Sequence, residues 1–126
     1  MAVKEIAFVA YPANDVAGLA KFYEDTLGLK LDQSMGEAPE MQFAQFTLPN
    51  NGWFSLIMLE WAGVPAGSGY GIAFEVDDIE ATLASLRGKA QQVDDEVYDT
   101  PVCRIAQFRD PEGNRVSLHQ STLPQG

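Results

Sequence analysis

The sequence predicts an α+β domain built from two similar halves, each with the order strand, helix, strand, strand, strand. Apolar, β-prone segments alternate with two helix-like segments, and each helix-like segment follows an aspartate. A glycine- and proline-rich stretch, residues 62–69, divides the chain near its middle. Residues 8–15, FVAYPAND, align without a gap with residues 71–78, GIAFEVDD. This weak internal repeat indicates that the domain arose by duplication.

The first module comprises about residues 1–61. It opens with an apolar segment that predicts a buried strand over 6–11. Asp15 is a suitable N-cap for a helix that runs to about Leu27, because the apolar residues after it recur at helical spacing, and Gly28 follows where a C-terminal glycine belongs. The remaining strands are expected over 29–34, 41–48 and 53–61, with a hairpin turn at 49–52.

The second module, about residues 70–126, repeats this order after the linker at 62–69. A strand is expected over 70–76, and Asp77 or Asp78 caps a second helix through about Arg87. Three further strands are expected over 91–96, 102–109 and 115–120.

The charge of the chain bears on its partners. Eighteen acidic residues against eight lysines and arginines give a net charge of −10, which argues against nucleic acid and against anionic membrane surfaces as partners. The acids gather at 37–40, 77–80 and 94–99. They serve solubility or, as a sharper alternative, create a field that attracts cationic ligands.

The sequence contains no membrane or export signal. No apolar run approaches the ~20 residues that span a bilayer, and the N-terminus lacks the apolar core of a signal peptide. The single cysteine, Cys103, is expected to be a buried structural thiol. We therefore expect a cytoplasmic protein of one domain over residues 1–126.

Two motifs connect the chain to a known family. Residues 108–118, FRDPEGNRVSL, have the composition of a strand, a tight turn and a second strand, since Asp110, Pro111 and Gly113 suit a turn. Together with residues 11–31, YPANDVAGLAKFYEDTLGLKL, they resemble the vicinal oxygen chelate superfamily of glyoxalases, bleomycin-resistance proteins and extradiol dioxygenases. The resemblance implies two modules whose sheets curve into a mixed sheet around a cleft, and it implies a homodimer.

Metal-dependent members of that family hold a divalent ion at four positions, which correspond here to Phe8, Met58, Gly71 and Ser117. None of these residues is a good ligand for such an ion, so we expect no metal and no other cofactor. A shift of two residues along two of the strands would bring in Glu60 and His119, which leaves a displaced metal site as an alternative.

The resemblance implies a cleft lined by apolar and aromatic side chains. Trp53 and Trp61 flank the fourth strand and can stack on a planar or cationic ligand. Leu56 and Met58 either line the cleft or fill the core. The expected ligand-binding set consists of Phe8, Trp53, Phe54, Met58, Glu60, Trp61, Gly71, Ser117 and His119.

Two functions remain open from the sequence. The first is a metal-free protein that binds a small molecule, as the drug-sequestering bleomycin-resistance branch does, with a preference for cationic or neutral aromatic ligands over anions. The second is a glyoxalase-like lyase or isomerase that uses a displaced metal or a carboxylate base such as Glu60 or Glu75. No other catalytic constellation, phosphate loop or dinucleotide motif is present.

Overall fold

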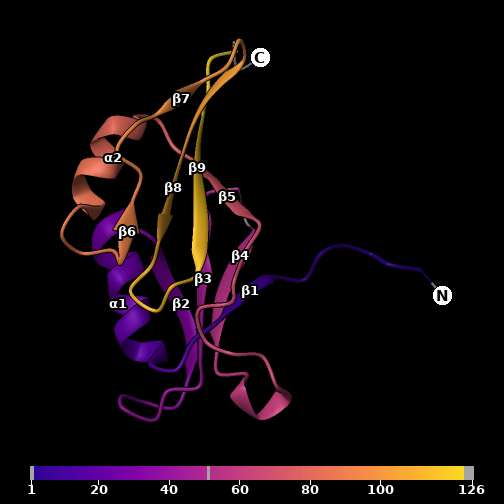
Figure 1. Cartoon of the computed structure of the whole chain (residues 1–126). Coiled ribbons are helices and arrows are strands. Elements are labelled where there is room, and N and C mark those ends of the chain that lie inside the picture. Colours follow the sequence, from indigo (N-terminus) through magenta and orange to yellow (C-terminus); the bar gives the residue numbers. More distant parts are fainter. Residues whose placement is uncertain (1, 51, 124–126) are drawn as a thin grey trace.

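The computed structural model describes residues 2–50 and 52–123, and consists of two mixed sheets with both helices on the same side of them (Figure 1). In chain order the elements are β1 (Val9–Pro12), α1 (Val16–Leu27), β2 (Lys30–Met35), β3 (Phe43–Thr47), β4 (Trp53–Ile57), the 3₁₀ turn η1 (Glu60–Ala62), β5 (Ile72–Glu75), α2 (Ile79–Leu86), β6 (Gln92–Val93), β7 (Tyr98–Asp99), β8 (Cys103–Arg109) and β9 (Arg115–Ser121).

The two sheets share one plan. The first has the strand order β1-β4-β3-β2, and the second has the order β5-β9-β8-β6 with β7 also paired to β8. In each sheet the first strand of the module runs parallel to the last, and the other pairs are antiparallel. The predicted α+β fold class is confirmed.

Both helices begin where the sequence places them. The Asp15 carboxylate accepts a hydrogen bond from the backbone N–H of Gly18, and the Asp78 carboxylate accepts one from Ala81. Gly28 ends α1 with φ of 68°, a left-handed conformation that glycine adopts without the Cβ penalty. Within the described part of the chain, no helix is long and apolar enough to cross a membrane.

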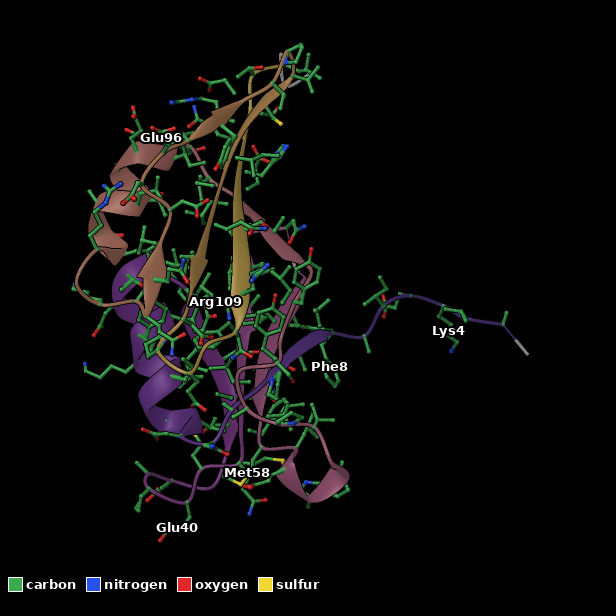
Figure 2. All side chains as sticks on the ribbon, in the orientation of Figure 1. Lys4, Phe8, Glu40, Met58, Glu96 and Arg109 are labelled. Carbon is green, nitrogen blue, oxygen red and sulfur yellow. The ribbon has the colours of Figure 1, made fainter. Side chains whose placement is uncertain are left out.

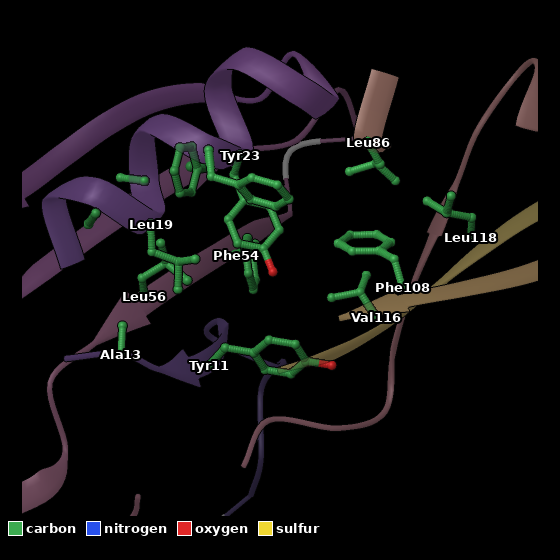
Figure 3. Close-up of a cluster of buried hydrophobic side chains, with 14 of the residues drawn as sticks. Tyr11, Ala13, Leu19, Tyr23, Phe54, Leu56, Leu86, Phe108, Val116 and Leu118 are labelled. Atoms are coloured by element: carbon green, nitrogen blue, oxygen red, sulfur yellow. The ribbon is translucent and has the colours of Figure 1, made fainter. Parts of the chain in front are cut away.

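One core joins the two modules, because the buried faces of both sheets and both helices meet in a single cluster (Figure 3). Aromatic rings fill its centre: Tyr23 of α1 lies edge-on to Phe54 of β4 at 5.2 Å between centroids, and Phe46 stacks on Phe54 at 6.0 Å. Phe54 also contacts Phe74 of the second module at 5.4 Å.

Hydrogen bonds fasten the modules together near the turn between β8 and β9. The Tyr11 hydroxyl donates to the carbonyl of Arg115 and accepts from the N–H of Ile72. The Asn114 side chain donates to the Pro12 carbonyl and accepts from the N–H of Gly69. A side chain at position 69 would collide with the Tyr11 ring at 2.7 Å, so this close approach requires glycine.

Three predicted strands differ from the structure. The first begins at Val9 instead of residue 6, because its pairing with β4 starts there, and Ile6 and Phe8 are exposed, so the expectation of a buried strand is wrong for residues 6–8. The fourth strand ends at Ile57 instead of Trp61, because the chain turns into η1, and Gly63 closes that turn in the left-handed conformation. The strand expected over 91–96 is only two residues long, and β7 was not predicted. Of the turn expected at 49–52, Asn51 lies outside the described residues, while Leu48 donates to the Gly52 carbonyl.

Candidate functional site

A shallow hollow of about 400 Å³ lies where β1, β4 and β5 meet, so both modules contribute to it. Alternation along β4 places Phe54 and Leu56 in the core, and therefore turns Trp53 to the face opposite the helices. Ala73 of β5 is turned outward in the same way, between Ile72 and Phe74. The bordering residues are Val9, Leu48, Trp53, Phe54, Tyr70, Gly71, Ile72, Ala73 and Phe74, and none carries a charge.

Exposed aromatic side chains surround this hollow. Trp53 is 42% exposed and Tyr70 is 72% exposed, although both are large and apolar. Phe8 lies just before β1 (Figure 2) and meets Phe43 of β3 edge-to-face at 6.4 Å. Such an exposed aromatic group beside a hollow is typical of a binding surface.

Polar side chains occupy the same face of the second module. Glu75, on β5, stands opposite His119 of β9, and its Oε1 lies 2.5 Å from His119 Nδ1. Its other oxygen accepts from the N–H of Ser121 at 2.8 Å. The Ser121 N–H, and then the His119 hydrogen bond, lower the pKa of Glu75, so this carboxylate is ionised at neutral pH. Two residues before His119 on β9, the Ser117 hydroxyl accepts a hydrogen bond from the Gln107 side chain of β8 at 3.0 Å.

The structure distributes the predicted site residues among three places. Trp53 and Gly71 border the hollow. Phe8 lies, with Trp53, on the face of the first module opposite the helices, where it contacts Phe43. Ser117 and His119 lie on the corresponding face of the second module. Phe54 also borders the hollow but is only 2% exposed. The prediction that it faces into the cleft is wrong, because its side chain packs against Tyr23 of α1 in the core. Leu56, for which the cleft and the core were both open, fills the core.

Met58, Glu60 and Trp61 lie beyond the end of β4, outside the hollow. Trp61 is 83% exposed, and its indole N–H donates to the Met58 carbonyl at 3.1 Å. Glu60 borders a different depression, beside Asn14 and Val64. Their placement in the cleft was predicted from a strand that continues to Trp61, and η1 replaces that part of the strand.

The alternative metal site at Glu60 and His119 is not formed in this structure. His119 is hydrogen-bonded to Glu75, whereas Glu60 lies in η1. Across residues 2–50 and 52–123, no three histidine, cysteine, aspartate or glutamate side chains cluster closely enough to hold a metal ion. The expectation that the protein carries no metal stays a prediction.

Six residues that border the hollow are absent from the predicted ligand-binding set: Val9, Leu48, Tyr70, Ile72, Ala73 and Phe74. Val9 and Tyr70 come from different modules, and their proximity depends on the edge of β1 lying beside the edge of β5. The internal repeat contains a signal for this arrangement, since it aligns Phe8 with Gly71, so that the two edges are equivalent strands.

A larger groove of about 770 Å³ runs between the C-terminal end of α1, the β3–β4 hairpin and α2. It shares Leu48 and Phe74 with the hollow, so the two lie along the same seam between the modules. Small and aliphatic residues form most of its lining, and Phe74 is its only aromatic residue among those described. The hollow is the better candidate site because it adds the exposed rings of Trp53 and Tyr70.

Comparison with known proteins identifies relatives of this chain. A model of the Glyoxalase/Bleomycin resistance protein/Dioxygenase superfamily matches residues 5–118. A glyoxylase-like domain-containing protein of Didymella fabae is 30% identical over 113 residues, which cover 87% of this chain and 88% of the relative.

Two solved structures from Streptomyces sp. CB03234 are also similar. TnmS3, described as an antibiotic binding protein, is 29% identical with a TM-score of 0.75, over 97% of this chain and 99% of that one. A glyoxalase/bleomycin resistance protein is 31% identical with a TM-score of 0.69, over 92% of this chain and all of the other.

Proposed function

Because the chain belongs to the Glyoxalase/Bleomycin resistance protein/Dioxygenase superfamily, we propose that it binds a small aromatic molecule in the hollow between its modules. The observation that carries this proposal is the partly exposed Trp53 beside an uncharged, apolar depression. A tryptophan left in water on a rigid strand forgoes stabilisation that a bound planar molecule would restore. The description of TnmS3 as an antibiotic binding protein supports the binding of a small molecule as the function.

The net charge of the chain is a poor guide to the charge of this ligand. Most residues of the acidic clusters lie on loops or at the start of α2, with Glu40 and Glu96 toward opposite ends of the molecule (Figure 2). No acidic side chain borders the hollow within the described residues. Aromatic contact area, and not an acidic field, is therefore the basis for the proposal.

The two tryptophans provide a matched test. We expect Trp53→Ala to weaken binding of the neutral probe 2-naphthamide at least tenfold in calorimetric titration, since ~100 Å² of lost apolar contact corresponds to about 2.5 kcal/mol. Trp61→Ala removes the same side chain outside the hollow and should leave the affinity unchanged. Equal losses in both variants, or no binding by the wild-type protein, would contradict the proposed site.

A second candidate function is an isomerase or lyase that moves a proton. The observation in its favour is the pair of His119 and ionised Glu75, in which the carboxylate holds Nδ1 and leaves the other ring nitrogen for a substrate. Deuterium uptake beside the carbonyl of an α-keto substrate, followed by NMR in wild-type protein and in His119→Gln, tests this alternative. No uptake above the buffer rate would exclude it for that substrate class.

A further inference from the structure

Two arginines stand side by side at the closing hairpin of the second module. Arg109 of β8 and Arg115 of β9 are register partners, and each follows or precedes a core residue, so both side chains lie on the face opposite the helices. The Arg115 N–H donates to Gly69 and the Arg109 carbonyl accepts from Gln91, so the two arginines do not bond to each other through the backbone. In such non-hydrogen-bonded pairs the side chains approach closely, with Cα atoms about 4.5 Å apart.

This juxtaposition is unfavourable unless something compensates for it. Like charges directly opposite each other destabilise a sheet. The chain contains eighteen acidic residues, any of which could neutralise an arginine if it lay beside it. Arg104, on the other face of β8, has Asp99 and Glu80 within 4.0 Å. Neither Arg109 nor Arg115 has a carboxylate within that distance anywhere in residues 2–50 and 52–123.

A small depression of about 150 Å³ lies over the pair. This volume is well above the ~15 Å³ that a single water needs, so a carboxylate fits. Gln92 and Gln107 border the depression as neutral polar groups, and Asp94 is the one acid among its described bordering residues. Asp94 directs one oxygen to the N–H of Gln107 at 2.9 Å, and two guanidinium groups against one carboxylate leave the depression positive.

Tyr70 connects this depression to the hollow. The guanidinium carbon of Arg115 lies 5.9 Å from the centre of the Tyr70 ring, and Tyr70 also borders the hollow. An aromatic body in the hollow and an anionic substituent over the arginines can therefore belong to one molecule. The planar guanidinium fork matches the two oxygens of a carboxylate better than any other group in the neighbourhood.

We propose that Arg109 and Arg115 form a carboxylate-binding subsite, so that the ligand of this protein is an aromatic acid. This proposal rests on the proposed function, because the hollow must hold the aromatic part. It reverses the charge preference expected from the net charge of −10, since two neighbouring guanidinium groups outweigh a distant acidic surface at contact range.

The test compares 2-naphthoate with its neutral analogue 2-naphthamide by calorimetric titration. Wild-type protein should bind the acid at least about tenfold more tightly than the amide, and this preference should weaken with added salt. Arg109→Gln and Arg115→Gln should each remove most of the preference while they retain the affinity for the amide. Equal affinity for both probes in the wild type would overturn the subsite and leave the hollow intact, whereas no binding of either probe would overturn the hollow itself.

Arg104→Gln is the matched control, because it removes one arginine from the same strand on the opposite face. It should keep the preference, and a loss equal to that of Arg115→Gln would mean that net charge and not the pair selects the anion. Inorganic phosphate supplies an anion without the aromatic body. It should raise the melting temperature of wild-type protein by more than that of Arg109→Gln, since phosphate as an excluded salt also stabilises both proteins in general. Equal shifts in both would also overturn the proposal.

Discussion

Replacement of Asp110 by alanine should be among the most destabilising substitutions in this chain. Its side chain is completely buried at the turn between β8 and β9. One oxygen accepts from the Tyr23 hydroxyl at 2.8 Å and from the Asn114 side chain at 2.9 Å. The other accepts from the N–H groups of Glu112 and Asn114, both at 3.0 Å.

The expected magnitude follows from the donors that would lose their partner. In Asp110→Ala the buried Tyr23 hydroxyl and the Asn114 N–H both lose the carboxylate oxygen that accepts from them, and each unsatisfied buried donor costs about 1–3 kcal/mol. We expect a loss of about 3–5 kcal/mol in the free energy of unfolding, beyond the range of most single substitutions. For a domain of this size that corresponds to a melting temperature lower by roughly 10–20 °C.

Urea denaturation and thermal melting of both proteins measure this loss. Tyr23→Phe removes one of the four hydrogen bonds and keeps the carboxylate, so it should cost only about 1–2 kcal/mol. If Asp110→Ala costs less than 1 kcal/mol, the buried carboxylate does not organise the hairpin and the reasoning is wrong.

Three further predictions concern the whole protein. Burial and then the Asp110 carboxylate raise the pKa of Tyr23 well above its ordinary value of 10.0. The free energy of unfolding should therefore fall as the pH rises above 10.0, because the unfolded chain loses this proton more readily than the folded one. Urea denaturation at alkaline pH should show a smaller fall in Tyr23→Phe. The protein should be a homodimer, because all residues of the edge strand β2 and the apolar Val3 and Ile6 are exposed; sedimentation of a monomer at micromolar concentration would contradict this. Elemental analysis should find no stoichiometric transition metal, and about one ion per chain would refute that expectation.

Local signals were sufficient to predict the helices and the closing hairpin. Asp15 and Gly28 act on backbone groups within a few residues of themselves, so α1 was predicted with the correct ends. The turn at Asp110 and Gly113 is likewise local, with Gly113 donating to the Asp110 carbonyl.

The site depended on information that is not local. Alternation establishes that Phe54 and Leu56 share one face of β4, but the position of α1 decides that this face is the core. Residues 58–61 are apolar enough for a strand, and only the turn closed by Gly63 shows that Trp61 leaves the sheet. The pairing of Arg109 with Arg115 follows from the register of the hairpin. The net charge of −10 gives no sign of this local pair of positive charges.

The hydrogen bonds between the two modules are concentrated at one end of their interface, and this distribution has a consequence for their relative motion. Hydrogen bonds from Tyr11 and Asn114 lock them together at the β8–β9 turn, and the Glu112 carboxylate adds bonds to the backbone N–H groups of Asn14 and Asp15. Toward the β3–β4 hairpin, apolar packing and the Ser85–Thr26 hydrogen bond join them, and the large groove opens there. We therefore expect the two modules to open by a hinge motion about the β8–β9 turn. Backbone amides near Phe74 should then exchange their hydrogen with solvent before those near Ile72. A ligand too large for the resting hollow would enter from the side of the β3–β4 hairpin, where fewer hydrogen bonds join the modules.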